Sequence, residues 1–317
     1  MQVNLNQAIA KLQAGEVVAI PTETVYGLAA DATNESALRQ IYAIKQRPAN
    51  NPLIVHIGDI AQVSNWAATF LPLAQKLANA FWPGPFTLVL PAKEGVSTIL
   101  RAGEPTVALR IPSHPLTLQL LQQSGLALAA PSANKYTQLS PTTAAHVAAG
   151  LGHNVPILDG GACEVGIEST IVSVINDEWQ LLRHGMIAEA AIAAIAGKPA
   201  VVGLQHVPKA PGQHLLHYSP KTPVRLFDSL AALIHYQQAS ETLCAALFIN
   251  DDAHQTSMQN CTYIYLPKQA AYVATHLYQV LHELDALNVA NLLVQLPPDT
   301  PEWAAILDRL KRAAYQA

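Results

Sequence analysis

A chain of 317 residues is longer than one hydrophobic core comfortably fills, so two domains are the first expectation. Half of the residues are apolar and 13% are charged, which is typical of a globular protein and excludes the disordered and coiled-coil classes. The formal net charge is -4, and residues 1–205 (11 basic against 13 acidic) and 206–317 (7 against 9) each carry -2. Neither part therefore has the bulk positive charge of a nucleic-acid-binding module.

The cysteines and the N-terminal segment indicate the compartment. Cys163, Cys244 and Cys261 form no CxxC pair, which argues against a disulfide framework or a zinc ribbon and fits a reducing cytosol. The N-terminus lacks a basic region followed by an apolar signal core, and no apolar run reaches the roughly 18 residues of a membrane span. We therefore expect a cytoplasmic protein with no membrane contact.

Strands and helices alternate along the first two hundred residues. Strands are predicted at 17–21, 53–57, 87–92, 106–111, 126–132, 156–161, 169–175 and 178–184. Helices are predicted at 6–14, 34–45, 73–82, 114–125, 142–152 and 187–197, with Asn34 as the N-cap of the second. This mixture predicts an α/β layer fold whose strand-end loops carry the function.

The segment 206–222 differs, because its prolines and histidines follow neither a helical nor a strand period. We interpret it as a linker between a catalytic domain, 1–205, and a C-terminal domain, 223–317. In the latter, strands at 224–228, 244–249, 262–267 and 289–297 alternate with helices at 230–238, 270–287 and from 302 onward. This alternation predicts a small, mostly parallel sheet.

The pair Lys45 and Arg47 stands where a helix ends, just before an apolar strand. Cations at a helix C-terminus are common because they complement the helix dipole. Here Pro48 stiffens the loop and Asn51 adds a polar side chain, so the loop can also present an ammonium and a guanidinium fork to a phosphate.

Other polar residues interrupt apolar strands or follow them. Thr22, Thr24 and Tyr26 alternate after a strand, so their hydroxyl groups are predicted to share one side of the chain, although β-propensity alone explains the pattern equally well. Arg110 lies inside an apolar strand and is either a strand-end residue or a buried anion clamp. Ser132, Asn134 and Ser140 follow a strand and either offer hydroxyl and amide donors to a ligand or form a turn with local side-chain hydrogen bonds. Ser169 and Arg183 come from two later strands and can approach the same site, and His56 lies within the strand that follows the cation pair.

Several standard motifs are absent from the sequence. It contains no GxxxxGK[ST] phosphate loop, no GxGxxG fingerprint, no GxSxG elbow and no HExxH pair, and the 12 histidines lack zinc-ligand spacing. From the residues alone we predict an anion-binding α/β enzyme without a protein-held metal.

Six segments, in this order and spacing, support a more specific prediction: PTETVYGLAADA, KQRPANNPLIVHI, FWPGPFTLVL, TVALRIPSHP, AAPSANKYTQLSPTTAAHV and ILDGGACEVGIESTIVSV. Together they resemble the YrdC/Sua5 family of threonylcarbamoyl-adenylate synthases over residues 5–200. The segment APGQHLLHYSPKTPV is similar to the linker of its longer, two-domain Sua5 form. The resemblance implies a YrdC-like twisted mixed-sheet domain followed by a smaller Rossmann-like parallel-sheet domain.

The resemblance also implies a reaction. L-threonine, bicarbonate (or CO2) and ATP would give threonylcarbamoyl-adenylate and pyrophosphate, for N6-threonylcarbamoyladenosine at position 37 of tRNA. Mg2+ is expected with ATP, held mostly by phosphate oxygens and water. A downstream threonylcarbamoyl transferase complex would use the product, and a weak contact with tRNA is a further expectation.

The site residues implied by the resemblance fall into three groups. Lys45 and Arg47 match the catalytic KxR pair, which faces the phosphates and the carbamate. The positions expected around threonine are Thr24, His56, Arg110, Ser132 and Ser169. The positions expected around ATP are Lys45, Arg47, Asn51, Asn134, Ser140, Arg183 and Tyr218.

The chain departs from the family at a few positions. The linker reads APGQ where the family has SPGM, and Leu216 replaces a basic residue, which puts the contacts of the linker's first half in doubt. Gln46 stands inside KxR where glycine is common, and we expect this change to be tolerated because the position separates the two cations.

Two alternative functions remain open. An RNA-binding module of the same fold would need more Lys and Arg than either half carries. A carbamoyl-transfer domain of the hydrogenase-maturation type would be accompanied by acylphosphatase and zinc-finger regions, which this sequence lacks.

Overall fold

The computed structural model describes residues 1–202, 208–212, 217–240, 242–249 and 258–315. The chain divides into two compact units: the first comprises Met1–Tyr136 and Pro141–Gln213, and the second comprises Thr137–Ser140 and His214–Ala317. The predicted boundary at 205 and the departures at Gln213 and Leu216 lie outside the described residues. The proposed limits of the two domains and the linker therefore stay predictions.

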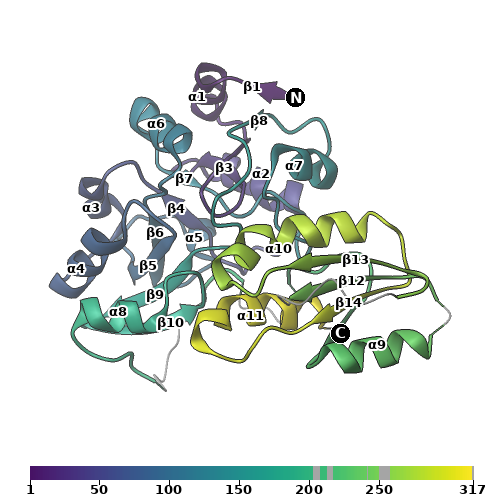
Figure 1. The fold of residues 1–317 in the computed structure, drawn as a ribbon. Helices are drawn as coiled ribbons and strands as arrows, with labels where there is room; N and C mark the ends of the chain where they lie inside the picture. Colours follow the sequence, from purple (N-terminus) through teal and green to yellow (C-terminus); the bar gives the residue numbers. More distant parts are fainter. Residues whose placement is uncertain (203–207, 213–216, 241, 250–257, 316–317) are drawn as a thin grey trace. The chain divides into compact units, whose positions relative to one another are not determined.

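The first unit is built on a ten-stranded mixed sheet in the order β1-β8-β2-β3-β7-β4-β6-β5-β9-β10 (Figure 1). Its strands are β1 (Gln2–Val3), β2 (Val18–Ile20), β3 (Gly27–Asp31), β4 (Ile54–His56), β5 (Phe86–Pro91), β6 (Thr106–Arg110), β7 (Leu128–Ala129), β8 (Ile157–Leu158), β9 (Thr170–Ile175) and β10 (Glu178–Arg183). Parallel pairs such as β4 with β6 alternate with antiparallel pairs such as β5 with β6. The mixed sheet predicted for this part is confirmed.

Helices and short 3-10 turns connect these strands. They are α1 (Leu5–Gln13), α2 (Glu35–Lys45), η1 (Ile60–Gln62), α3 (Val63–Trp66), α4 (Pro72–Phe81), α5 (Thr98–Arg101), α6 (Pro115–Ser124), α7 (Ala144–Leu151) and α8 (Glu189–Ala196). Helix α2 begins as predicted, because the Asn34 side chain accepts a hydrogen bond from the Ala37 N–H. Its last residue is Lys45, and the following C-cap residue, Gln46, adopts the left-handed conformation with φ of 52°. This conformation explains why glycine suits the middle position of KxR.

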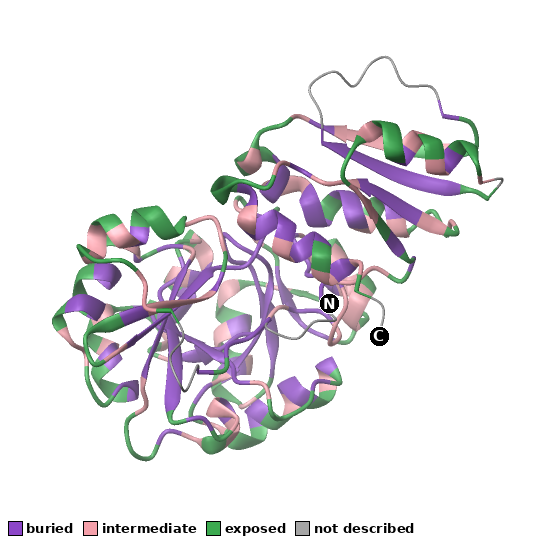
Figure 2. Cartoon of the chain, turned by 90° about the horizontal axis from the view of Figure 1, so that it is seen from below, coloured by how far each residue is buried: buried purple, intermediate pink, exposed green. Residues whose placement is uncertain are grey.

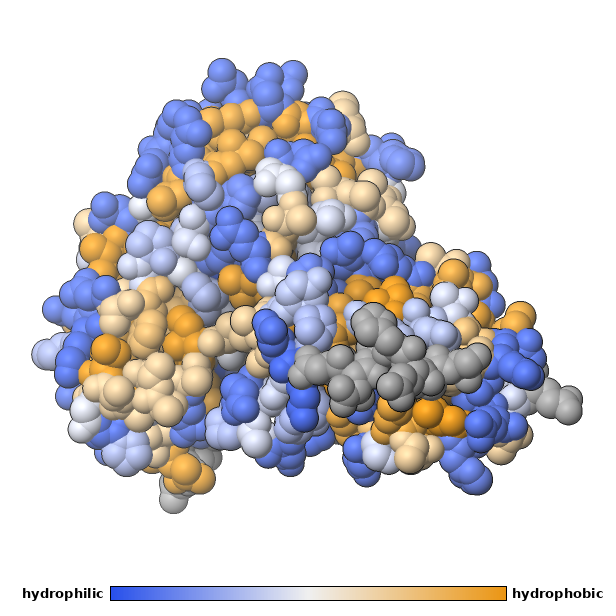
Figure 3. All heavy atoms as spheres, in the orientation of Figure 1, coloured by the Kyte–Doolittle hydropathy of each residue, from blue (hydrophilic) through white to orange (hydrophobic). Residues whose placement is uncertain are grey.

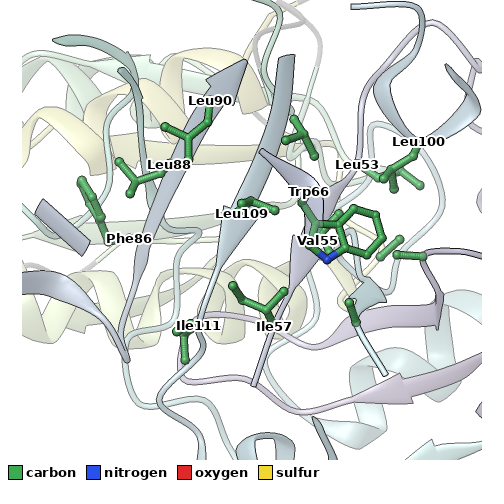
Figure 4. Close-up of a cluster of buried hydrophobic side chains, with 14 of the residues drawn as sticks. Leu53, Val55, Ile57, Trp66, Phe86, Leu88, Leu90, Leu100, Leu109 and Ile111 are labelled. Carbon is green, nitrogen blue, oxygen red and sulfur yellow. The ribbon is translucent and has the colours of Figure 1, made fainter. Parts of the chain in front are cut away.

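Side chains alternate across the central strands, and the alternation separates core from site. Figure 4 shows the apolar cluster on one face, to which β4 and its flanks contribute Leu53, Val55 and Ile57, and β6 contributes Leu109. Because successive side chains point to opposite faces of a strand, the intervening His56 and Arg110 lie on the other face. The same alternation places Thr87 of β5 and Ser169, just before β9, opposite the cluster.

The second unit contains a four-stranded, fully parallel sheet in the order β11-β14-β12-β13. Its strands are β11 (Val224–Phe227), β12 (Cys244–Ile249), β13 (Cys261–Leu266) and β14 (Asn291–Gln295), and its helical segments are α9 (Leu230–Gln238), α10 (Ala270–Asp285), η3 (Pro301–Trp303) and α11 (Ala304–Ala313). Figure 2 shows buried strands and helices that are exposed along one side in this unit. The predicted parallel sheet is confirmed.

Most predicted elements occur within a few residues of their expected bounds, but β1, β3, α3 and α5 were not predicted. The segment 22–26 is a loop between β2 and β3 rather than a continuation of a strand. On the face shown in Figure 3, hydrophilic residues lie between smaller hydrophobic areas, as on most water-exposed surfaces. No helix among the described residues is long and apolar enough to cross a membrane.

Candidate functional site

Three groups of buried polar side chains in the first unit contain most of the predicted site residues. The first group surrounds Arg110, which is 4% exposed at the end of β6. Its Nε donates to the Gly84 carbonyl at 3.2 Å and its Nη1 donates to Thr24 Oγ1 at 3.0 Å. Its Nη2 lies 2.7 Å from the carboxylate of Glu23, an ion pair that the sequence did not predict. His56 is the register partner of Arg110 on the neighbouring strand.

The electrostatics of this group follow from its burial. Burial and the Arg110 charge lower the pKa of His56 to about 3, so its imidazole is neutral at physiological pH. Burial raises the pKa of Glu23, but the charge and hydrogen bond of Arg110, together with backbone N–H groups, lower it by more in sum, so the carboxyl group stays ionised. The group thus pairs one anion with one cation beside a neutral imidazole.

The second group joins the KxR segment to the segment 132–134, and both segments contain positions expected around ATP. The Lys45 ammonium donates to the Ser132 carbonyl at 2.5 Å and to the Asn134 carbonyl at 2.6 Å. Lys45 is 1% exposed, and burial together with the nearby Arg47 charge lowers its pKa well below the usual value. An anion in this group would offset both effects, so the lysine would favour a bound phosphate.

Arg47 and Asn51 complete the second group. Arg47 is buried, donates from Nη2 to the Pro52 carbonyl at 3.1 Å, and has its guanidinium 6.0 Å from the centre of the Tyr136 ring. The Asn51 side chain donates to Asn50 Oδ1 at 3.2 Å and lies 3.5 Å from the Tyr136 hydroxyl. Both cations of KxR are therefore fixed by their surroundings rather than solvated on a mobile loop.

The third group joins Ser169 and Arg183. The Ser169 hydroxyl lies 2.8 Å from Thr87 Oγ1, and Arg183 Nη2 donates to Ser169 Oγ at 3.1 Å. Arg183 also donates to the Ser169 carbonyl and, from Nη1, to the Pro211 carbonyl. Pro211 belongs to the segment whose first half departs from the family pattern, so a backbone contact of that segment is present despite the sequence change.

Backbone hydrogen bonds connect the three groups. Gly84 accepts from Arg110, and the next carbonyl, that of Pro85, accepts from Thr170 N at 3.0 Å, beside Ser169. The Tyr26 carbonyl, two residues after Thr24, accepts from Ala133 N at 2.8 Å, between Ser132 and Asn134. Hydrogen bonds thus link the segments that carry the three groups, although these segments lie far apart in the sequence.

The remaining predicted residues are placed differently. Ser140 and Tyr218 belong to the second unit, where His282 Nε2 lies 3.2 Å from the Ser140 carbonyl and the Arg309 guanidinium lies 5.1 Å from the centre of the Tyr218 ring. Tyr26 was predicted to share a side with Thr22 and Thr24. Instead, the two threonine hydroxyls contact each other at 2.8 Å, whereas the Tyr26 hydroxyl donates to the Gly161 carbonyl.

Two other features of the described residues do not coincide with these groups. A hollow of about 580 Å³ in the first unit is lined by residues such as Glu35, Trp66, Lys93 and Ser97, and it contains no predicted site residue. No cluster of three or more His, Cys, Asp or Glu side chains within the described ranges could hold a metal ion.

Comparisons with known proteins agree along nearly the whole chain. Residues 10–185 match the Sua5/YciO/YrdC family model, described as telomere recombination, and residues 183–315 match the model described as threonylcarbamoyl-AMP synthase, C-terminal domain. Threonylcarbamoyl-AMP synthase of Bacillus subtilis is 40% identical over 97% of this chain and 92% of its own length, and that of Pyrococcus abyssi is 35% identical over 96% and 92%. The crystal structure of P. abyssi Sua5 complexed with L-threonine superposes with a TM-score of 0.90 at 31% identity, covering 99% of this chain and 97% of that one.

Proposed function

The chain belongs to the Sua5/YciO/YrdC family, and on that premise we propose that it is a threonylcarbamoyl-AMP synthase. It converts L-threonine, bicarbonate (or CO2) and ATP into threonylcarbamoyl-adenylate and pyrophosphate, for N6-threonylcarbamoyladenosine in tRNA. The observation that carries the proposal is the nearly full-length likeness to synthases at 35–40% identity and to a structure complexed with L-threonine.

The Arg110 group is the proposed threonine site. The Arg110 guanidinium takes the substrate carboxylate, because a planar cation in a buried environment is well suited to a carboxylate. Thr24 holds Arg110 and faces the same ligand, and the neutral His56 adds a hydrogen-bonding group without a charge. Ser132 and Ser169, at the edges of the neighbouring groups, are the other proposed threonine contacts.

The Lys45 group is the proposed phosphate and carbamate site. Lys45 and Arg47 offset the repulsion between an anionic carbamate and the α-phosphate that it attacks. Asn51, Asn134 and Arg183 are proposed to contact the nucleotide. The same role for Ser140 and Tyr218, which lie in the second unit, rests on the motif match alone.

The proposed chemistry depends on positioning and charge rather than on a protein nucleophile. The threonine amine captures CO2, and the carbamate oxygen then attacks the α-phosphate with pyrophosphate as the leaving group. Holding the reactants together can lower the barrier by about 7–11 kcal/mol. The buried cations are preorganised by carbonyl groups of the protein, which strengthens their effect on the developing charge.

Mg2+ is proposed to arrive with ATP. The polar side chains of the Lys45 group are cationic or neutral, and the described residues offer no acidic cluster to hold the ion. The phosphate oxygens and water would therefore supply its ligands. The protein is further proposed to act in the cytoplasm and to deliver its adenylate to a threonylcarbamoyl transferase complex.

Pyrophosphate release tests this function. With ATP and bicarbonate, the wild-type protein should release pyrophosphate only when L-threonine is added. The Lys45→Ala/Arg47→Ala variant should lose this release while keeping its thermal transition. Release that does not depend on threonine, or no release by the folded wild type, would contradict the proposal.

A further inference from the structure

Glu23 is a buried carboxylate for which the proposed reaction has no role so far. It lies in the loop between β2 and β3, is 3% exposed, and forms an ion pair with Arg110 in which Glu23 Oε1 and Arg110 Nη2 are 2.7 Å apart. A carboxylate so deeply buried is strongly disfavoured unless a cation compensates it. Arg110 is equally buried, so each group needs the other in the absence of a ligand.

The contacts around Arg110 define the plane of its guanidinium. Gly84 and Thr24 accept hydrogen bonds from Nε and Nη1, and Glu23 lies beside Nη2. Even when Glu23 takes one N–H group of Nη2 at this distance, the second N–H group of Nη2 is left over. An arginine has five N–H donors, and the hydrogen bonds to Gly84 and Thr24 use two of them. Donors on both terminal nitrogens therefore remain for a ligand.

The loop that carries Glu23 is itself held in place. The Thr22 hydroxyl accepts from the N–H groups of Thr24 and Val25 and donates to the Val25 carbonyl at 2.6 Å, which closes a tight turn around Glu23. The Glu23 carbonyl accepts a hydrogen bond from Val165 N at 2.7 Å. Because the backbone on both sides is fixed, the carboxylate can hold Arg110 in one orientation with little loss of freedom when a ligand binds.

We propose that Glu23 is a positioning residue for the substrate carboxylate, which keeps Arg110 oriented and charge-compensated until L-threonine binds. The inference rests on the proposed function, in which Arg110 takes that carboxylate. Glu23 acts through Arg110 and touches neither ATP nor the reacting phosphate. Its loss should therefore weaken the use of threonine far more than the use of ATP.

The test compares Glu23→Gln with a matched variant, Glu104→Gln. Glu104 is a second buried glutamate of the first unit, paired with Lys209 at 3.3 Å and outside the three groups. Glu23→Gln should raise the KM for threonine at least tenfold and leave the KM for ATP within twofold, while Glu104→Gln should leave both within twofold. A Glu23→Gln variant with an unchanged threonine KM and a normal thermal transition would overturn the inference.

Further measurements keep the inference testable if Glu23→Gln folds poorly. Glu23→Asp keeps the charge and should restore part of the threonine affinity in titration calorimetry, a readout that needs no turnover. In a double-mutant comparison, Arg110→Gln/Glu23→Gln should bind threonine no more weakly than Arg110→Gln alone. Independent, additive losses would contradict action through Arg110. Threonine-independent pyrophosphate release by the wild type would instead contradict the proposed function, so the two failures are distinguishable.

Discussion

The two units of the chain bury charge to different extents. Among the described residues of the first unit, seven Lys, Arg and Glu side chains are buried: Glu23, Lys45, Arg47, Glu104, Arg110, Glu168 and Arg183. In the second unit, Arg309 is the one buried side chain of this kind among the described residues, and its sheet is otherwise packed with apolar side chains. Burying charge is unfavourable for stability, so its concentration in one unit indicates where the chemistry is placed.

The largest effect expected from this difference is a substitution in the second unit that lowers stability but leaves the use of threonine unchanged. Phe248 in β12 is fully buried, and Phe248→Ala should lower the free energy of unfolding by about 3–5 kcal/mol through lost burial and a cavity. Urea unfolding followed by circular dichroism measures the loss. At temperatures where the variant stays folded, its threonine KM should equal that of the wild type. A threonine KM that rises together with the loss of stability would contradict the placement of the chemistry in the first unit alone.

The opposite result is expected for a cation of the proposed phosphate site in the first unit. Arg47→Met should reduce kcat/KM for ATP by about 100- to 1000-fold, which corresponds to roughly 2.7–4 kcal/mol of transition-state stabilisation. Steady-state pyrophosphate release measures the change. Arg39→Met, on the exposed side of helix α2, is the matched control and should keep full activity. A loss of less than fivefold in Arg47→Met would remove Arg47 from the phosphate site.

Acid should destabilise the first unit through His56. In the folded chain its pKa is about 3, below the usual 6.5, so the unfolded chain binds a proton between these values that the folded chain does not bind. Stability is therefore fully present above pH 6.5 and falls as the pH drops, by about 3 kcal/mol at pH 4. Urea unfolding at pH 7 and at pH 4 measures this loss. Between the two pH values, the free energy of unfolding of the wild type should fall by about 3 kcal/mol more than that of His56→Gln. Equal losses in the two proteins would show that folding does not lower the pKa of His56.

The smallest expected effects concern the helix N-caps, one in each unit. Asn34 accepts from Ala37 N at the start of α2, whose last residue is Lys45, and Ser229 accepts from Ala232 N at the start of α9. Each substitution by alanine should lower stability by about 1 kcal/mol. Only Asn34→Ala should also lower activity measurably, because α2 carries Lys45 of the proposed phosphate site. Pyrophosphate release by both variants at matched fractions folded would sharpen or remove this distinction.

The sequence predicted features that depend on local chemistry. Neighbours along the chain predicted the Asn34 cap and the helix that ends at Lys45. They also marked Arg110, a charge inside an apolar strand, as a candidate site residue. Strand β3 was missed because its small residues, GLAAD, show no strand alternation, and the two-residue β1 is defined by pairing with β8, more than 150 residues away. Glu23 was overlooked for the same reason, since its partner lies 87 positions further along the chain. Long-range pairing of this kind leaves no local pattern.

Isotope-labelled product formation tests the central claim most directly. The folded protein would be incubated with ATP, L-threonine and 13C-bicarbonate, and the nucleotides analysed by mass spectrometry. We expect an adenylate with the mass of threonylcarbamoyl-AMP that carries the 13C label, disappears when threonine is omitted, and is lost in Lys45→Ala/Arg47→Ala. An adenylate without the label, or no threonine-dependent adenylate from the wild type, would contradict the assignment of this chain as a threonylcarbamoyl-AMP synthase.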